Sequence, residues 1–188
     1  SCGPGSANLI MSLANALADS SAFLAITANV PTQQFNRGPF QELNRHNQAD
    51  FPSLVRPVVK RSYQAYRVEM LPLMLRQATT NMLSGRPGPV NIDVPFNLFQ
   101  EEADVEKPSS GATSFISQRS GASDEDVRTA TDLLLKAERP LLFIGHGVTL
   151  SEASKELQAL VQRLNIPVIS SPNGMGCIDM SAPQSVGF

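Results

Sequence analysis

A glycine-rich turn ahead of a helix is the first segment of the chain that could carry chemistry. Gly3-Pro4-Gly5-Ser6 precedes apolar residues at helical spacing, which predicts a helix that ends near Asp19. Small residues let a ligand approach the backbone, and the start of a helix presents N–H groups that have no partner inside the helix. The alternative is an ordinary strand-to-helix turn. Asn8 is expected near the N-terminal end of the helix.

This turn is the first of an ordered set of motifs. The others are Ala25-Ile26-Thr27, Val30-Pro31, Phe40-Gln41-Glu42, Lys60 and Gly85-Arg86-Pro87-Gly88-Pro89-Val90. In this order they resemble the acetolactate synthase family of thiamine-diphosphate-dependent enzymes, where such motifs belong to the pyrimidine-binding domain. Further along, Arg139-Pro140, Gly145-His146-Gly147 and Ile166-Pro167-Val168 resemble the start of the same family's central domain. The resemblance covers nearly the whole chain.

The resemblance implies a carboligase that uses thiamine diphosphate and Mg2+. Such an enzyme decarboxylates pyruvate and joins the two-carbon unit to a second 2-keto acid. The implied catalytic residues are Gln41, Phe40 and Lys60. Phe40 and Gln41 would face the thiazolium and the bound intermediate, where an uncharged amide offers both a donor and an acceptor, and Lys60 would lie near the substrate entrance. The alternatives are a loop-stabilising amide, a packed aromatic ring and a lysine on a solvated strand end.

The resemblance also implies sites for two organic cofactors. The implied cofactor-binding residues are Pro4, Gly5, Asn8, Arg86, Gly145 and Gly147. Pro4 and Asn8 would lie against the aminopyrimidine ring of thiamine diphosphate. Arg86 and the two later glycines match positions that contact FAD in flavin-containing members, where glycine lets the backbone approach a dinucleotide. His146 departs from the glycine that such members often have, and similar loops occur in members that bind another nucleotide or none.

Two parts of the family's site are expected outside this chain. The resemblance places the catalytic glutamate upstream of Gly3, and the ligands of Mg2+ and the diphosphate in a third, C-terminal domain. The chain is therefore expected to be an incomplete piece of the enzyme, inactive alone and without metal ligands. Glu42 does not replace the missing glutamate, because its family position follows a glutamine in a loop. His46 and His146 lack neighbours at metal-ligand spacing and are not expected to bind zinc.

Alternating strand and helix patterns must position these residues. Residues 23–27, 54–59 and 90–94 are predicted strands, and 68–83 is a predicted helix between the last two. The sequence then predicts a helix from an N-cap at Ser123 to about Ala137, a strand over 141–144, a loop over 145–147, a helix over 151–164 and a strand over 167–170. The fold class is α/β, with two three-layer parallel-sheet units of the thiamine-diphosphate-enzyme type, both incomplete.

The stretch between the two halves is rich in Pro, Ser and Gly, which is typical of a linker. The predicted limits are 1–97 for a partial pyrimidine-binding domain, 98–122 for the linker and 123–188 for a partial central domain. Because the chain begins inside the expected fold, the first sheet should lack its initial strand.

Composition excludes several classes of function. The 188 residues carry 15 Lys and Arg against 17 Asp and Glu, with no basic cluster to follow a phosphate backbone, so nucleic acid is not an expected partner. The apolar runs are shorter than the roughly 20 residues that cross a bilayer, so no membrane association is expected and the protein is placed in the cytoplasm. Cys2 and Cys177 are too few for a disulfide framework and are expected to be reduced.

The expected partners are small 2-keto-acid substrates and further copies of the chain, in a homodimer or homotetramer of branched-chain amino acid biosynthesis. Departures from the family pattern at Gln34 and at residues 36–39, and a long stretch from Glu42 to Lys60, leave the substrate open. The alternatives are another 2-keto-acid decarboxylase, an acyl-CoA lyase of the same superfamily, or a non-catalytic nucleotide-binding module.

Overall fold

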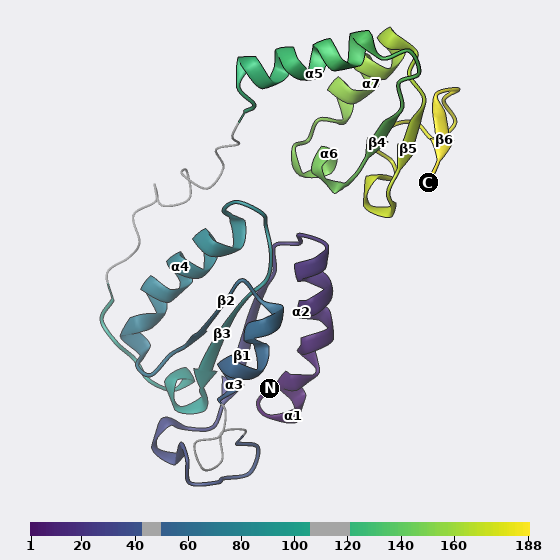
Figure 1. The fold of residues 1–188 in the computed structure, drawn as a ribbon. Helices are drawn as coiled ribbons and strands as arrows, with labels where there is room; N and C mark the ends of the chain where they lie inside the picture. The colour runs from purple at the N-terminus through teal and green to yellow at the C-terminus, as the bar shows by residue number, and fades with distance from the viewer. Residues whose placement is uncertain (43–49, 106–120) are drawn as a thin grey trace. The chain divides into compact units, whose positions relative to one another are not determined.

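The computed structural model describes residues 1–42, 50–105 and 121–188, and the chain divides into two compact units, Ser1–Ser117 and Gln118–Phe188 (Figure 1). Each unit contains a three-stranded sheet in which all described pairings are parallel. The predicted α/β class with parallel sheets is therefore confirmed. Parallel strands require crossover connections, and helices supply them in both units.

The first unit places its last strand in the middle of the sheet, in the order β1-β3-β2. Its helices are α1 (Pro4–Ala7), α2 (Leu9–Ala18), α3 (Phe51–Val55) and α4 (Leu71–Leu83), and its strands are β1 (Leu24–Asn29), β2 (Arg61–Gln64) and β3 (Val90–Pro95). Short 3-10 turns are η1 (Thr32–Gln34), η3 (Arg56–Val58), η4 (Val68–Met70) and η5 (Phe96–Phe99). The strand and helix predicted at 90–94 and 68–83 are thus found with small shifts at their ends.

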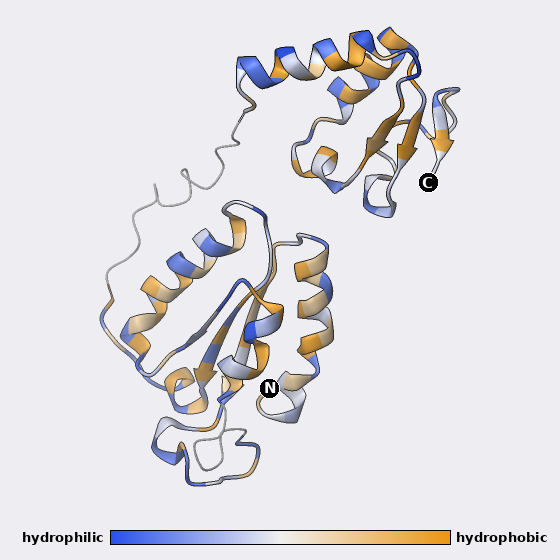
Figure 2. Ribbon diagram, viewed as in Figure 1, coloured by the Kyte–Doolittle hydropathy of each residue, from blue (hydrophilic) through white to orange (hydrophobic). Residues whose placement is uncertain are grey.

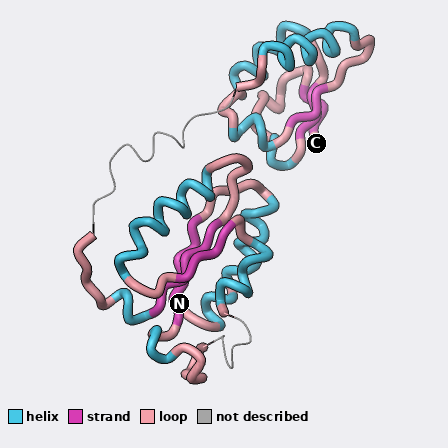
Figure 3. Tube along the Cα trace, turned by 60° about the vertical axis from the view of Figure 1, so that its left-hand side comes forward, coloured by secondary structure: helices cyan, strands magenta, loops and turns pink. Residues whose placement is uncertain are grey.

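The central strand β3 is buried along its whole length because helices cover both faces of the sheet. Val90, Ile92 and Val94 point to one face, where they pack with Met74 and Ala78 of α4. The tube trace in Figure 3 shows the three strands between α4 and the helices of the other face. In Figure 2, α4 alternates orange and blue along its length, as expected of a helix with one buried side.

The second face of this sheet is covered by α2 and α3. Leu13 of α2 packs with Phe51 and Val55 of α3 in a second core cluster. The strand predicted at 54–59 is therefore wrong. Asp50 caps a helix here, because its carboxylate accepts a hydrogen bond from the Ser53 N–H at 2.7 Å. Pro57 has no N–H to donate to a neighbouring strand, and the chain forms η3 there instead.

The second unit has the strand order β4-β5-β6. Its elements are α5 (Asp124–Lys136), β4 (Leu142–Ile144), α6 (His146–Leu150), α7 (Ser154–Leu164), β5 (Val168–Ser170), η7 (Pro172–Gly174) and β6 (Ser185–Gly187). Leu157 and Val161 of α7 pack against Ile144 and Val168 of the sheet. The predicted N-cap is confirmed, since the Ser123 hydroxyl accepts from the Asp126 N–H at 3.1 Å.

Two predictions for this unit need correction. The predicted loop at 145–147 is the start of the short helix α6, and the helix predicted at 151–164 begins later, at Ser154. Backbone bonds close the turn between the two helices: Ser151 N–H donates to Gly147 O at 2.9 Å, and Ala153 N–H donates to Val148 O at 3.0 Å. The strand β6 was not predicted, because three residues are too few for a period-2 pattern.

The predicted linker, 98–122, begins within η5, and its residues 106–120 lie outside the described part of the chain. The limits of the two predicted domains stay predictions. Among the described helices, none is long and apolar enough to cross a membrane.

Candidate functional site

The start of the chain lies at the carboxyl edge of the first sheet. The Ala28 N–H, close to the end of β1, donates to the carbonyl of Ser1 at 2.9 Å. The chain then turns at Gly3, whose backbone angles are φ 55° and ψ −126°, and enters α1 at Pro4. Only glycine adopts these angles readily, so the turn depends on Gly3. Open α/β sheets bind ligands at this edge.

Gln41 lies directly against this turn. A Cβ on Gly3 would stand 2.7 Å from the carbonyl oxygen of Gln41 and 2.9 Å from its Cβ, so the two backbones approach closely. The Cys2 thiol donates to Oε1 of Gln41 at 2.9 Å. Gln41 is exposed and adopts φ 71°, and the ring of Phe40 beside it is 86% exposed. Phe40 therefore lies outside the hydrophobic cores of the described residues.

The predicted pyrimidine-binding residues share this edge. Pro4 and Gly5 form the exposed first turn of α1, and Asn8 is the exposed junction between α1 and α2. The glycine-rich turn is thus one turn of helix followed directly by a longer helix. The structure brings Gln41 against Gly3, and Pro4, Gly5 and Asn8 follow Gly3 within five residues.

A buried polar network runs across the sheet toward the same edge. Asp93 of β3 accepts hydrogen bonds from three side chains: Thr27 Oγ1 at 2.9 Å, Asn29 Nδ2 at 2.7 Å and Gln64 Nε2 at 3.0 Å. Two residues before Asp93 in the same strand, Asn91 donates to Thr27 Oγ1 at 3.1 Å. Asp93, Asn91 and Thr27 are at most 1% exposed. The network ties all three strands together on the face that α2 and α3 cover.

Burial raises the pKa of the Asp93 carboxyl, because the charged form has lost its water. The three donors act against this shift, and the negative charge of Asp50 adds to it. The other amide atom of Asn29 extends the network outward, since Asn29 Oδ1 accepts from the Val30 N–H at 2.8 Å. Asp93 therefore supports, through Asn29, the start of the loop that carries Phe40 and Gln41.

Lys60 and Arg86 lie at the opposite, amino edge of the sheet. Lys60 directly precedes β2, and its backbone N–H donates to Pro89 O, just before β3, at 2.8 Å. Its ammonium donates to the carbonyls of Ser84 at 2.7 Å and Arg86 at 2.8 Å, and partial burial lowers its pKa. A Cβ on Gly88 would stand 2.9 Å from Lys60 Cδ, so this glycine makes room for the lysine stem.

The Arg86 guanidinium binds the end of α2. It donates to Ala18 O at 2.7 Å, Leu17 O at 3.3 Å and Ser20 Oγ at 2.6 Å. The helix ends at Ala18, and Ser20 follows two residues later with φ 58°. A cation at this end satisfies carbonyls that have no helical partner. Because α2 has 10 residues, its two ends are about 15 Å apart. The structure therefore does not bring Lys60 or Arg86 together with Gln41.

Removing Arg86 is expected to destabilise the first unit even without any ligand. Arg86→Ala should lower the free energy of unfolding by about 1 kcal/mol, because the last carbonyls of α2 lose their donors. Urea denaturation measures the change, and Arg76→Ala, on the exposed surface of α4, is the matched control. A variant as stable as the control would mean that the contacts seen here contribute nothing to the fold.

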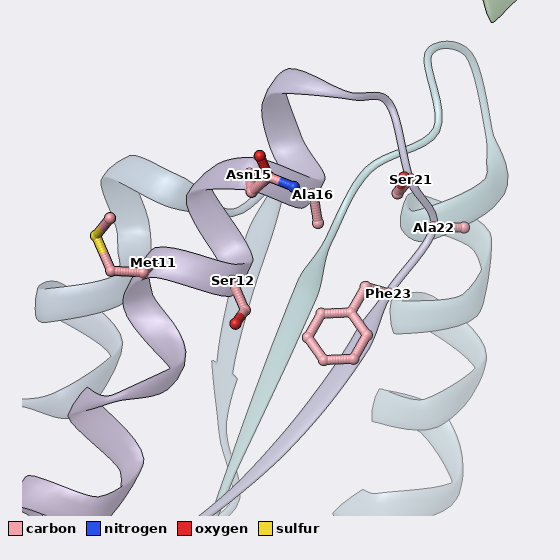
Figure 4. A pocket seen from close by; sticks show the side chains of 7 residues that line it. All are labelled: Met11, Ser12, Asn15, Ala16, Ser21, Ala22 and Phe23. Atoms are coloured by element: carbon pink, nitrogen blue, oxygen red, sulfur yellow. The ribbon is translucent and has the colours of Figure 1, made fainter. Parts of the chain in front are cut away.

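An open hollow of about 570 Å3 lies at the amino end of β1, between α2 and the segment that enters the strand. Figure 4 shows the residues that line it, with the hydroxyl of Ser12 on α2 turned toward the ring of Phe23. The hollow belongs to the end of the sheet that is remote from Gln41, and we assign it no part in the site.

The second unit holds the remaining predicted residues, Gly145 and Gly147, at the carboxyl end of β4 and the start of α6. A Cβ on Gly147 would meet nothing within 4 Å among the described residues, and one on Gly145 would make an ordinary 3.5 Å contact with Ser171 Oγ. By contrast, a Cβ on Gly174 would stand 2.7 Å from Ile144 O. Among the described residues, packing therefore explains glycine at 174 but not at 145 and 147.

In the described part of the chain, no group of three or more His, Cys, Asp or Glu side chains is arranged to hold a metal ion. His46 and the rest of residues 43–49 lie outside that part. Sequence reasoning missed the roles of Cys2, Asn29, Glu42 and Asp93. For Asp93 a signal existed, since the alternation Val-Asn-Ile-Asp-Val puts two polar residues in a strand that helices cover on both faces.

Both halves of the chain are similar to known proteins. Residues 127–188 match the family model of the thiamine pyrophosphate enzyme central domain. A probable acetolactate synthase large subunit of Methanococcus aeolicus is 36% identical over 99% of this chain, and an acetolactate synthase of Arthrospira platensis is 34% identical over 99%. The chain belongs to the acetolactate synthase family of thiamine-diphosphate-dependent enzymes. The similarity extends beyond one activity, because a glyoxylate carboligase of Escherichia coli O157:H7 is 32% identical over 94% of the chain.

The chain spans about a third of the length of these acetolactate synthase relatives, 31% for the two named above. The groups at the carboxyl edge of the first unit fit thiamine diphosphate, the cofactor of the family. It combines an exposed amide at Gln41, an exposed aromatic ring at Phe40 and a glycine turn that brings two backbones together. These groups suit a ring system that is both aromatic and hydrogen-bonding.

Proposed function

We propose that the chain supplies part of the active site of a carboligase that acts on 2-keto acids, with acetolactate formation from two pyruvates as the best single reaction. The observation that supports the proposal most strongly is the approach of Gln41 to the Gly3 turn at the carboxyl edge. Two segments that are 38 positions apart in the sequence, and that both carry family motifs, meet where an α/β fold binds ligands.

In the proposed site, thiamine diphosphate is held on this edge by Pro4, Gly5 and Asn8. When bound, it supplies the electron sink for decarboxylation and carbon–carbon bond formation. Gln41 contributes the amide protons of Nε2, because its Oε1 accepts from Cys2, and Phe40 excludes water from one side. Mg2+ and the diphosphate are bound by residues outside the chain.

We further propose that the amino edge and the second unit serve a flavin or another nucleotide. Arg86 would serve such a ligand in the first unit, and Gly145 with Gly147 in the second. Lys60 would act at the amino edge, near a substrate entrance, and not beside Gln41. The proposed enzyme is a cytoplasmic homodimer or homotetramer of branched-chain amino acid biosynthesis. The glyoxylate carboligase relative favours a second candidate, a carboligase for another small 2-keto acid.

Gln41→Ala tests the central proposal. In the holoenzyme that contains this chain, the variant should lower kcat by about 10²-fold while the cofactor dissociation constant changes less than threefold, because the amide acts on the reacting groups. Steady-state acetolactate formation from pyruvate, with a titration of thiamine diphosphate, measures both. Gln33→Ala, an exposed amide in η1, is the matched control. Full activity of Gln41→Ala would show that the residue only stabilises the loop.

A further inference from the structure

The loop that presents Gln41 has a strained backbone, and the side chain of Glu42 is hydrogen-bonded to it at two points. Asn36, Gly38 and Gln41 have φ of 63°, 70° and 71°, all in the left-handed region. Two of these residues are not glycine, so each adopts an unfavourable backbone conformation. Such a shape persists only where the surroundings stabilise it, and the Glu42 carboxylate provides the contacts.

Glu42 is 7% exposed and folds back into its own loop. Its Oε1 accepts a short hydrogen bond from the Asn36 N–H, and its Oε2 accepts from the Gly38 N–H at 2.7 Å. The Glu42 N–H donates to Pro39 O at 3.2 Å, which closes the same turn. Hydrogen bonds from backbone N–H groups to a carboxylate are stronger than neutral ones. Both oxygens are occupied by backbone donors, so Glu42 is not placed to act as an acid or base.

We propose that Glu42 is a positioning residue for Gln41. Its carboxylate fixes residues 36–42, so that Oε1 of Gln41 accepts from the Cys2 thiol at the carboxyl edge. The contact with Gly3 sets the distance between the loop and the turn before α1. The hydrogen bonds of Glu42 set the backbone conformation from which the Gln41 side chain projects. This inference rests on the proposed function for its catalytic consequence, but the structural role can be measured without it.

Glu42→Gln removes one acceptor and places an NH2 group against a backbone N–H. In the 188-residue chain, the amide protons of Asn36 and Gly38 should exchange with solvent at least tenfold faster, and this can be measured by NMR. Glu102→Gln makes the same charge change at an exposed position and should leave these rates within twofold of the unaltered chain. Glu42→Asp keeps the charge on a shorter stem and should give intermediate rates, with the urea transition confirming that each variant is folded.

The catalytic half of the inference is tested by a double-mutant comparison in the holoenzyme. Glu42→Gln should lower kcat by about 10²-fold with KM within threefold, since small displacements of a catalytic group have such effects. Glu42→Gln combined with Gln41→Ala should be no slower than Gln41→Ala alone, because the carboxylate acts through the amide. A multiplicative loss would overturn the positioning role, as would unchanged exchange rates at Asn36 and Gly38. If the unaltered holoenzyme forms no carboligation product, the proposed function fails, while the exchange rates still decide whether Glu42 holds the loop.

Discussion

Replacing Asp93 by alanine is expected to lower the free energy of unfolding of the first unit by about 3–5 kcal/mol. The change leaves the buried hydroxyl of Thr27 and the amides of Asn29 and Gln64 without their acceptor, and each such loss costs about 1–3 kcal/mol. A small cavity in the centre of the sheet adds to this cost. Urea denaturation gives the value, and Asp104→Ala, at an exposed position, is the control. A loss of less than about 1 kcal/mol would mean that water or rearranged side chains replace the carboxylate without difficulty.

Asp93→Asn removes the ionisable group of Asp93 but keeps a side chain of nearly the same shape. Burial raises the pKa of Asp93, so the folded chain holds this proton more tightly than the unfolded chain. The stability that the folded chain gains by holding this proton is therefore complete below about pH 4, the pKa in the unfolded chain. It is lost as the pH rises through the raised pKa of the folded chain. The stability difference between the unaltered chain and Asp93→Asn should thus be largest near pH 4 and smaller at pH 7. A difference that grows with pH would show that the three donors outweigh burial.

The sequence predicts best those elements whose residues form one continuous pattern. The strand at 90–94 and the helix at 68–83 appear as β3 with α4 because the apolar spacing of each segment matches one buried face. The segment at 54–59 looks equally like a strand by its β-branched residues, yet it forms α3 and η3. The decision comes from the Asp50 cap and the packing of Phe51 and Val55 on Leu13, which a local pattern does not contain.

In the candidate site, too, the sequence predicts some features and misses those that depend on tertiary contacts. Family motifs identify Gln41 and the Gly3 turn, and the structure brings them into contact. The motifs do not show that Lys60 and Arg86 lie at the amino edge. Their position depends on α2, which begins near the carboxyl edge and ends at the Arg86 guanidinium. Nor do they show why Glu42 follows Gln41, since the reason is a pair of bonds within a folded loop.

The other large effect is expected at Gly3. Gly3→Ala meets two obstacles, a backbone conformation that only glycine adopts readily and a Cβ 2.7 Å from Gln41 O. The conformation costs about 1–3 kcal/mol, and the overpacked contact adds about 1–3 kcal/mol. The atoms that must move are backbone atoms of the Gln41 loop. The free energy of unfolding should therefore fall by about 2–6 kcal/mol, as measured by urea denaturation.

Gly85→Ala is the control that separates the two terms. Gly85 has φ 59°, close to that of Gly3, but a Cβ there would meet nothing within 4 Å in the described structure. It should therefore show only the conformational cost, and the excess loss in Gly3→Ala measures the collision with Gln41. Because that collision displaces the proposed catalytic amide, Gly3→Ala should also lower kcat of the holoenzyme at least as much as Gln41→Ala does, by about 10²-fold. Equal losses of stability in the two glycine variants, with turnover retained in Gly3→Ala, would show that the turn and the Gln41 loop adjust independently of each other.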